Sequence, residues 1–237
     1  MVFGLSAFYW GNILWLKYNS LHDYVFDSGV FLDSLYQIFY FHSTSTIVSY
    51  TGSSPDRIIF SPLSIFHSIL LLLYIQLIAV LGSSFIIYYT LKKLTGNSVI
   101  SSIVSVLYLI YFPIDGSLFF DVHAQTFFIP FFLLGFMFQV MNRKYLSIIF
   151  FLLAGMTRFP LIGIVVLYSI LDFIRNFRIN RGLSNINKYK SLLNFDMLLF
   201  AFSFVILLFD LGIFVKQINV QTNIVISEDN ERDNHVE

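Results

Sequence analysis

The sequence contains no cysteine among its 237 residues and has few charged side chains. The lack of cysteine excludes a disulfide scaffold, thiolate metal sites and thiol redox chemistry. Charged residues make up 12% of the chain, about half of the roughly 25% that is typical of a soluble domain. Because so few charges cannot cover a water-facing surface of this size, the composition excludes a soluble enzyme and a disordered chain. Basic and acidic residues number 14 each, and this balance argues against a nucleic-acid partner.

What the chain has in abundance is apolar sequence, since 57% of its residues are hydrophobic. The hydrocarbon core of a bilayer is about 30 Å thick, so a spanning helix needs about 20 mostly apolar residues. Charge-poor segments predict an all-α, polytopic integral membrane protein with membrane lipid as its surroundings. About seven transmembrane helices are expected, at roughly 2–16, 62–91, 97–113, 124–142, 145–157, 159–174 and 192–215.

The chain divides into a transmembrane helical domain, 1–215, and a polar acidic tail, 216–237, which we expect to be disordered. Within the domain, 18–61 is predicted to be an outer loop, because 34–55 is too polar to span and would form at most a short interfacial helix. Residues 145–174 can form one long helix or two short ones. Pro160 favours two, because proline starts a helix well and interrupts one badly.

The orientation follows from the connections between the predicted helices. Three connections, at 92–93, 143–144 and 175–190, hold 9 of the 14 basic residues. Lysine and arginine in short connections favour the cytoplasmic side. We therefore expect a multi-pass cell-membrane protein with its amino terminus in the cytoplasm and its tail outside. The connections on the outer side are acidic, and Lys17, Arg57 and Arg158 are their basic residues.

Polar residues of the outer side suggest chemistry when they are taken together. Asp23 and Asp27 follow the first helix, Asp121 and His123 precede the fourth, and Arg158 lies between the fifth and sixth. Carboxylates with a histidine can hold a divalent cation such as Mg²⁺ or Mn²⁺, and a carboxylate can also deprotonate a hydroxyl. The guanidinium of arginine matches phosphate geometry. This combination suits transfer of a sugar from a lipid-linked phosphate.

Each of these residues also has a purely structural interpretation. The acidic residues near 23–27 can be solvated loop charges, and Asp27 can form a turn before Gly29. Asp121 can stabilise a helix amino terminus, His123 can be an interfacial side chain, and Arg158 can extend its charge to the interface. Two polar residues inside predicted spans are expected to be structural: His67 as a packed polar residue, and Gln76 in an interhelical hydrogen bond.

Several short motifs follow one another in a recognisable order. They are Phe26-Asp27-Ser28-Gly29-Val30-Phe31, Phe60-Ser61-Pro62-Leu63, Gln76 in the second helix, Tyr108-Leu109-Ile110-Tyr111-Phe112-Pro113 and Phe120-Asp121-Val122-His123. In this order they resemble a family of predicted archaeal and bacterial membrane proteins known as domain of unknown function 2079. That family is similar to the GT-C class of membrane glycosyltransferases. The resemblance covers roughly residues 18–170.

The resemblance implies a GT-C-like fold and a sugar transfer from a polyprenyl-phosphate donor on the extracytoplasmic face. Asp27 or Asp23 would be the catalytic carboxylate of the first outer loop. Asp121 with His123 would form the second acidic site, where a metal binds, and Arg158 would meet the lipid phosphate. The chain can also be a truncated or inactive relative. A transporter component and a non-catalytic membrane partner protein are the alternatives from other classes.

Overall fold

A computed structural model describes residues 1–20, 25–42, 55–119, 121–180 and 199–208. All regular secondary structure in these residues is helical, which confirms the predicted all-α class. The elements are α1 (Val2–Asn19), α2 (Val25–Phe41), α3 (Pro55–Phe60), the 3-10 helix η1 (Ser61–Phe66), α4 (Ile69–Thr95), α5 (Ser98–Leu109), α6 (Phe112–Phe119), the 3-10 helix η2 (Ala124–Phe127), α7 (Phe128–Val140), α8 (Lys144–Gly155) and α9 (Phe159–Asn180). A further helical stretch covers Leu199–Leu208.

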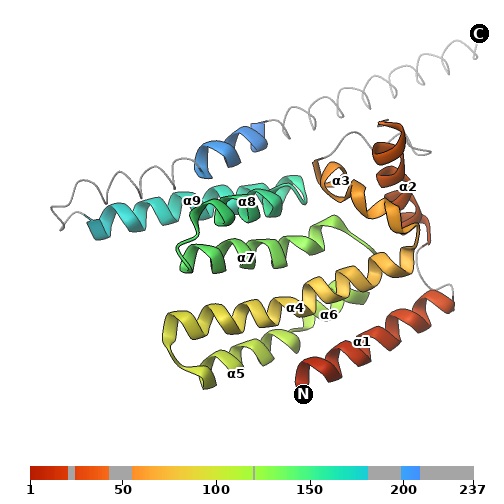
Figure 1. Cartoon of the computed structure of the whole chain (residues 1–237), viewed down its shortest axis with the longest axis horizontal. Helices are drawn as coiled ribbons and strands as arrows, with labels where there is room; N and C mark the ends of the chain where they lie inside the picture. The colour runs from red at the N-terminus through yellow and green to blue at the C-terminus, as the bar shows by residue number, and fades with distance from the viewer. Residues whose placement is uncertain (21–24, 43–54, 120, 181–198, 209–237) are drawn as a thin grey trace, which may run out of the picture.

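The longer helices run back and forth between two ends of the molecule (Figure 1). One end holds the α4–α5 turn, the α7–α8 turn and the carboxyl-terminal part of α9. We call this the basic end, because its elements carry six basic residues: Lys92, Lys93, Arg143, Lys144, Arg175 and Arg178. The opposite end holds α2, α3, η1, η2 and the α8–α9 junction.

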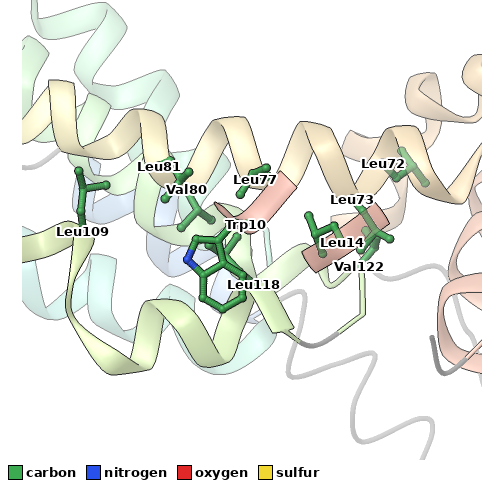
Figure 2. Close-up of a cluster of buried hydrophobic side chains, with 10 residues drawn as sticks. All are labelled: Trp10, Leu14, Leu72, Leu73, Leu77, Val80, Leu81, Leu109, Leu118 and Val122. Carbon is green, nitrogen blue, oxygen red and sulfur yellow. The ribbon is translucent and has the colours of Figure 1, made fainter. Parts of the chain in front are cut away.

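The central helix is α4, which packs against α1, α5 and α7. Its start is fixed by Ser68, whose side chain accepts a hydrogen bond from the amide of Leu71, and it ends at Gly96 with a φ of 69°. A left-handed residue after a helix is most easily a glycine, since other side chains are strained there. Figure 2 shows the apolar cluster along one side of α4, to which Trp10 and Leu14 of α1 contribute.

Small residues bring neighbouring helices close together. The hydroxyl of Ser105 on α5 donates a hydrogen bond of 2.7 Å to the carbonyl of Ser84 on α4. On α7, a Cβ atom at Gly135 would lie 2.8 Å from Cδ1 of Phe151 on α8. Phe151 belongs to a second core, which α8, α9 and Leu199 share. Serine and glycine are the residue types that allow such close helix packing in membranes.

Three of the predicted helix boundaries can be compared directly with the structure. The helix expected at 97–113 is wrong at its end, since α5 ends at Leu109 and a separate helix, α6, starts at Phe112. The break at Arg158 is confirmed, because α8 ends at Gly155 and α9 starts at Phe159. The expected helix at 62–91 is wrong at its start, since 61–66 form η1 and His67 has a left-handed φ of 46°. Instead of being buried in a helix, His67 is exposed at this break, with its ring centroid 5.6 Å from that of Tyr36.

The region expected to be an outer loop, 18–61, contains α2 and α3. In the described part of the chain, one helix is long and apolar enough to cross a membrane by length and composition, and it is α4. Its 27 residues give a rise of about 40 Å. Shorter apolar helices cover Ser98–Leu109, Ala124–Val140, Lys144–Gly155 and Leu199–Leu208. The predicted tail, 216–237, lies outside the described residues.

Large apolar side chains are exposed on several helices as well as buried in three core clusters, the third of which holds Leu35, Phe60, Ala124 and Phe127. On α5 and α9 they form continuous outward surfaces: Val99, Ile100, Ile103 and Leu107 on α5, and Ile164, Leu167, Leu171 and Ile174 on α9. The helix α1 exposes Leu5, Phe8, Trp15 and Leu16. Contiguous apolar surface of this kind marks a protein-interaction or membrane-interaction surface.

Candidate functional site

The opposite end contains a buried ion pair between α1 and the segment that follows α6. Lys17, in the last turn of α1, places Nζ 3.0 Å from Oδ1 of Asp121, and the two side chains are 7% and 3% exposed. The same ammonium donates a hydrogen bond of 2.8 Å to the carbonyl of Phe119. A lysine at a helix carboxyl terminus is also stabilised by the helix dipole. The pair therefore ties the 119–121 segment to the end of α1.

Gln76 connects the same segment to the middle of α4. Its Nε2 donates a hydrogen bond of 3.1 Å to the carbonyl of Ser117 on α6, and its Oε1 accepts one of 3.2 Å from the amide of His123. Gln76 is 1% exposed, so these bonds replace those that water would otherwise supply. The expectation that Gln76 makes an interhelical hydrogen bond is confirmed.

The predicted metal ligands Asp121 and His123 have other neighbours in the structure. Asp121 faces the ammonium of Lys17, and Nδ1 of His123 lies 2.8 Å from the carbonyl oxygen of Val122. Among the described residues, no three histidine or carboxylate side chains form a group that could hold a metal ion. A cation next to Lys17 would be repelled by its charge. As placed, Asp121 with His123 does not fit a divalent cation, and the metal site stays a prediction.

Arg158 lies at the junction of α8 and α9, and its side chain is exposed. One of its terminal nitrogens donates a hydrogen bond to Oε1 of Gln125 in η2. The guanidinium is thus held beside η2 while most of its donors stay open to a ligand or to solvent. This position suits both predicted roles, the phosphate contact and the interfacial charge.

The two candidate catalytic carboxylates cannot be placed in this site. Asp23 lies outside the described residues, and Asp27 lies in the first turns of α2, where its side chain is outside them as well. Their catalytic role stays a prediction. The position of α2 is known, however: it packs against α3 and η1 at the opposite end of the molecule.

A third basic residue of this end, Arg57, received no role from its sequence context. It lies on α3, one turn before Phe60, whose ring centroid is 4.8 Å from that of Phe127 in η2. Arg158 bonds to Gln125 of the same short helix, so α3 and the side chain of Arg158 both contact η2. The available signal was an arginine that directly precedes the apolar residues Ile58, Ile59 and Phe60.

A second polar cluster joins α7 and α9 towards the basic end. Nε2 of Gln139 donates a hydrogen bond of 2.6 Å to Oδ2 of Asp172, and the hydroxyl of Tyr168 donates to Oε1 of Gln139. Arg175 forms an ion pair with Asp172, which is 4% exposed. The sequence signal was a single carboxylate within an apolar helix, where ionisable residues are costly.

Comparison of the chain with protein-family models, with curated proteins and with solved structures finds no match.

Proposed function

We propose that the chain is a polytopic, GT-C-like membrane protein that transfers a sugar from a polyprenyl-phosphate donor at its opposite end. The observation that carries the proposal is the separation of charge between the two ends. Six basic residues lie in the elements of the basic end, while the opposite end holds an ion-paired Lys17, an exposed Arg158 and the helix that carries Asp27. With basic residues on the cytoplasmic side, the opposite end faces outwards.

The exposed apolar surfaces support the multi-pass arrangement. Side chains on α1, α5 and α9 would contact lipid, and the serine and glycine contacts between helices are of the kind found in membranes. The amino terminus lies before α1, whose carboxyl end reaches the opposite end of the molecule (Figure 1). In this arrangement the amino terminus is cytoplasmic. The shorter helices, such as the 12 residues of α8, would cross a thinned bilayer or only part of it.

In the proposed reaction, a carboxylate acts as the general base and Arg158 holds the leaving group. Asp27, or Asp23 as the alternative, takes the proton of the acceptor hydroxyl. The hydroxyl oxygen forms a bond to the anomeric carbon of the sugar, and the bond from that carbon to the phosphate oxygen breaks. The polyprenyl phosphate leaves with the electron pair, and the guanidinium of Arg158 stabilises its charge. The proposed step needs only side chains of the chain itself, and Lys17 already pairs with Oδ1 of Asp121, the predicted metal ligand.

The test is an assay of sugar transfer from lipid-linked donors by the purified protein and its Asp27→Asn variant. A general base contributes about 100- to 10,000-fold to a rate, so transfer should fall by at least the lower of these factors. Asp33→Asn, on the same helix α2 as Asp27, is the control and should keep its activity. Unchanged transfer in Asp27→Asn would remove the assignment, and Asp23→Asn would then test the alternative carboxylate.

A second test looks for the lipid itself. Native mass spectrometry of the detergent-released protein should show a polyprenyl-phosphate adduct that Arg158→Ala loses. Only ordinary phospholipids in both samples would favour an inactive relative or a non-catalytic partner protein.

A transporter component is the second candidate, and buried Asp172 is the observation that favours it. Ion pathways place ionisable groups inside membrane proteins, and Asp172 is 4% exposed between α7 and α9. Substrate flux into proteoliposomes that is lost in Asp172→Asn would support this function. Flux that is absent with the wild-type protein would exclude it for the chain acting alone.

A further inference from the structure

Arg57 on α3 carries hydrogen-bond donors that the described part of the chain does not satisfy. Its Nε and Nη1 atoms are buried, and neither has a hydrogen-bond partner among the described residues. The guanidinium keeps its charge in proteins and has no acceptor of its own. Buried donors on a charged group are costly to leave without an acceptor. The arrangement therefore favours an acceptor that is not part of α3 or its described neighbours.

Among the described residues, the negative charge beside Arg57 does not outweigh the burial of its guanidinium. Burial lowers the pKa of Arg57, and the nearby carboxylate of Asp56 opposes this effect but is the weaker of the two. Asp121, the buried carboxylate of this end, faces Lys17 instead. An anion beside Arg57 would compensate for the burial of its charge, because opposite charges attract most strongly where water is excluded.

The helix α3, which carries Arg57, and the side chain of Arg158 both contact the short helix η2. Phe60, one turn after Arg57, packs its ring on Phe127 of η2, and Arg158 donates to Gln125 of η2. Both arginines therefore lie at the opposite end of the molecule, where the proposed function places the lipid phosphate. Two arginines can supply donors to different oxygens of one phosphate group, which has several acceptor oxygens.

We propose that Arg57 is a phosphate-binding residue, which contacts the phosphate of a ligand bound at the opposite end of the molecule beside η2. The chemistry is shared by a lipid-linked phosphate and by free inorganic phosphate. The choice of the lipid-linked form rests on the proposed function, whereas the phosphate contact rests on the unsatisfied donors of Arg57.

The experiment measures binding to the full chain in detergent, with farnesyl phosphate and inorganic phosphate as separate probes. We expect farnesyl phosphate to bind the wild-type protein and to raise its melting temperature. Arg57→Gln should weaken the affinity about tenfold or more, since a charge-assisted hydrogen bond is lost. The control is Arg143→Gln at the basic end, which has an exposed side chain and should bind as the wild type does.

The outcomes separate the possible ligands. Binding of farnesyl phosphate alone supports a lipid-linked phosphate, and equal binding of both probes supports free phosphate. No binding of either probe, or an affinity that Arg57→Gln leaves unchanged, overturns the proposal. If Arg57→Gln does not fold, Arg57→Lys decides, because it keeps the charge and loses the guanidinium donors. An affinity unchanged in Arg57→Lys then overturns the proposal.

The same samples distinguish this proposal from the proposed function. Arg57-dependent binding of farnesyl phosphate without any sugar transfer leaves the phosphate contact standing and removes the transferase. Sugar transfer together with an affinity for farnesyl phosphate that does not depend on Arg57 would keep the transferase and overturn the phosphate contact of Arg57.

Discussion

Nζ of Lys17 lies 3.0 Å from Oδ1 of Asp121, although 104 positions separate the two residues in the sequence. The pair closes the end of α1 against the segment between α6 and η2. Both charges are almost completely buried, so each depends on the other for compensation. Asp121 thus has a structural role at this end of the molecule, whatever further role it has.

Breaking this ion pair should destabilise the protein strongly. Lys17→Met leaves a buried carboxylate without its ammonium, and such a loss typically costs about 3–5 kcal/mol. Asp121→Leu should have a similar effect. The double variant should lose less than the sum of the two, because an apolar pair leaves no unpaired charge. Thermal unfolding in detergent measures all three.

The control for this cycle is Lys93→Met at the basic end. Lys93 is exposed, so its replacement should change the stability by less than about 0.5 kcal/mol. Strictly additive losses in the double variant would show that the two buried charges do not stabilise each other.

Replacing Gln76 by leucine should loosen the segment that carries His123. The substitution removes an acceptor for the amide of His123 and a donor for the carbonyl of Ser117. Each buried group left without a partner costs about 1–3 kcal/mol. Hydrogen exchange of peptides that cover 117–123 should become faster, while peptides of α8 should be unaffected. Unchanged protection at His123 would show that this hydrogen bond adds little.

Gly135→Ala should destabilise the contact between α7 and α8. The added Cβ would lie 2.8 Å from a ring carbon of Phe151, which is fully buried and cannot move aside easily. Overpacking of a core costs about 1–3 kcal/mol. Gly82→Ala on α4 is the matched control, since a Cβ there has no atom within 4 Å. Thermal unfolding should separate the two variants, and equal melting temperatures would contradict the close packing at Gly135.

The orientation of the protein can be tested with single cysteines, because the natural chain has none. Ile65→Cys reports on η1 at the opposite end, and Ser98→Cys reports on the α4–α5 turn at the basic end; both positions are exposed. In intact cells, a membrane-impermeant maleimide should label Cys at position 65 and should reach position 98 only after permeabilisation. The reverse pattern would place the basic end outside.

Several features of the fold could be predicted because their causes are local. The break before α9 follows from Pro160, which cannot continue α8 without the loss of a backbone hydrogen bond. The bond of Gln76 to a neighbouring helix follows from its position in an apolar helix, where an amide must find a partner. The start of α4 was missed, because residues 61–66 are apolar enough for a long helix, yet they form η1.

The sequence by itself determined that this protein is helical and apolar, because composition and the spacing of charges act along the chain. Only the tertiary structure decided which polar groups meet. The sequence places Lys17 and Asp121 in two separate outer connections, and their pairing depends on how α1 and α6 pack on α4. In the sequence, Arg57 is only a basic residue of an outer connection, and the burial of two of its nitrogens results from packing at the opposite end. Burial and partner choice depend on neighbours distant in sequence, and therefore no local pattern records them.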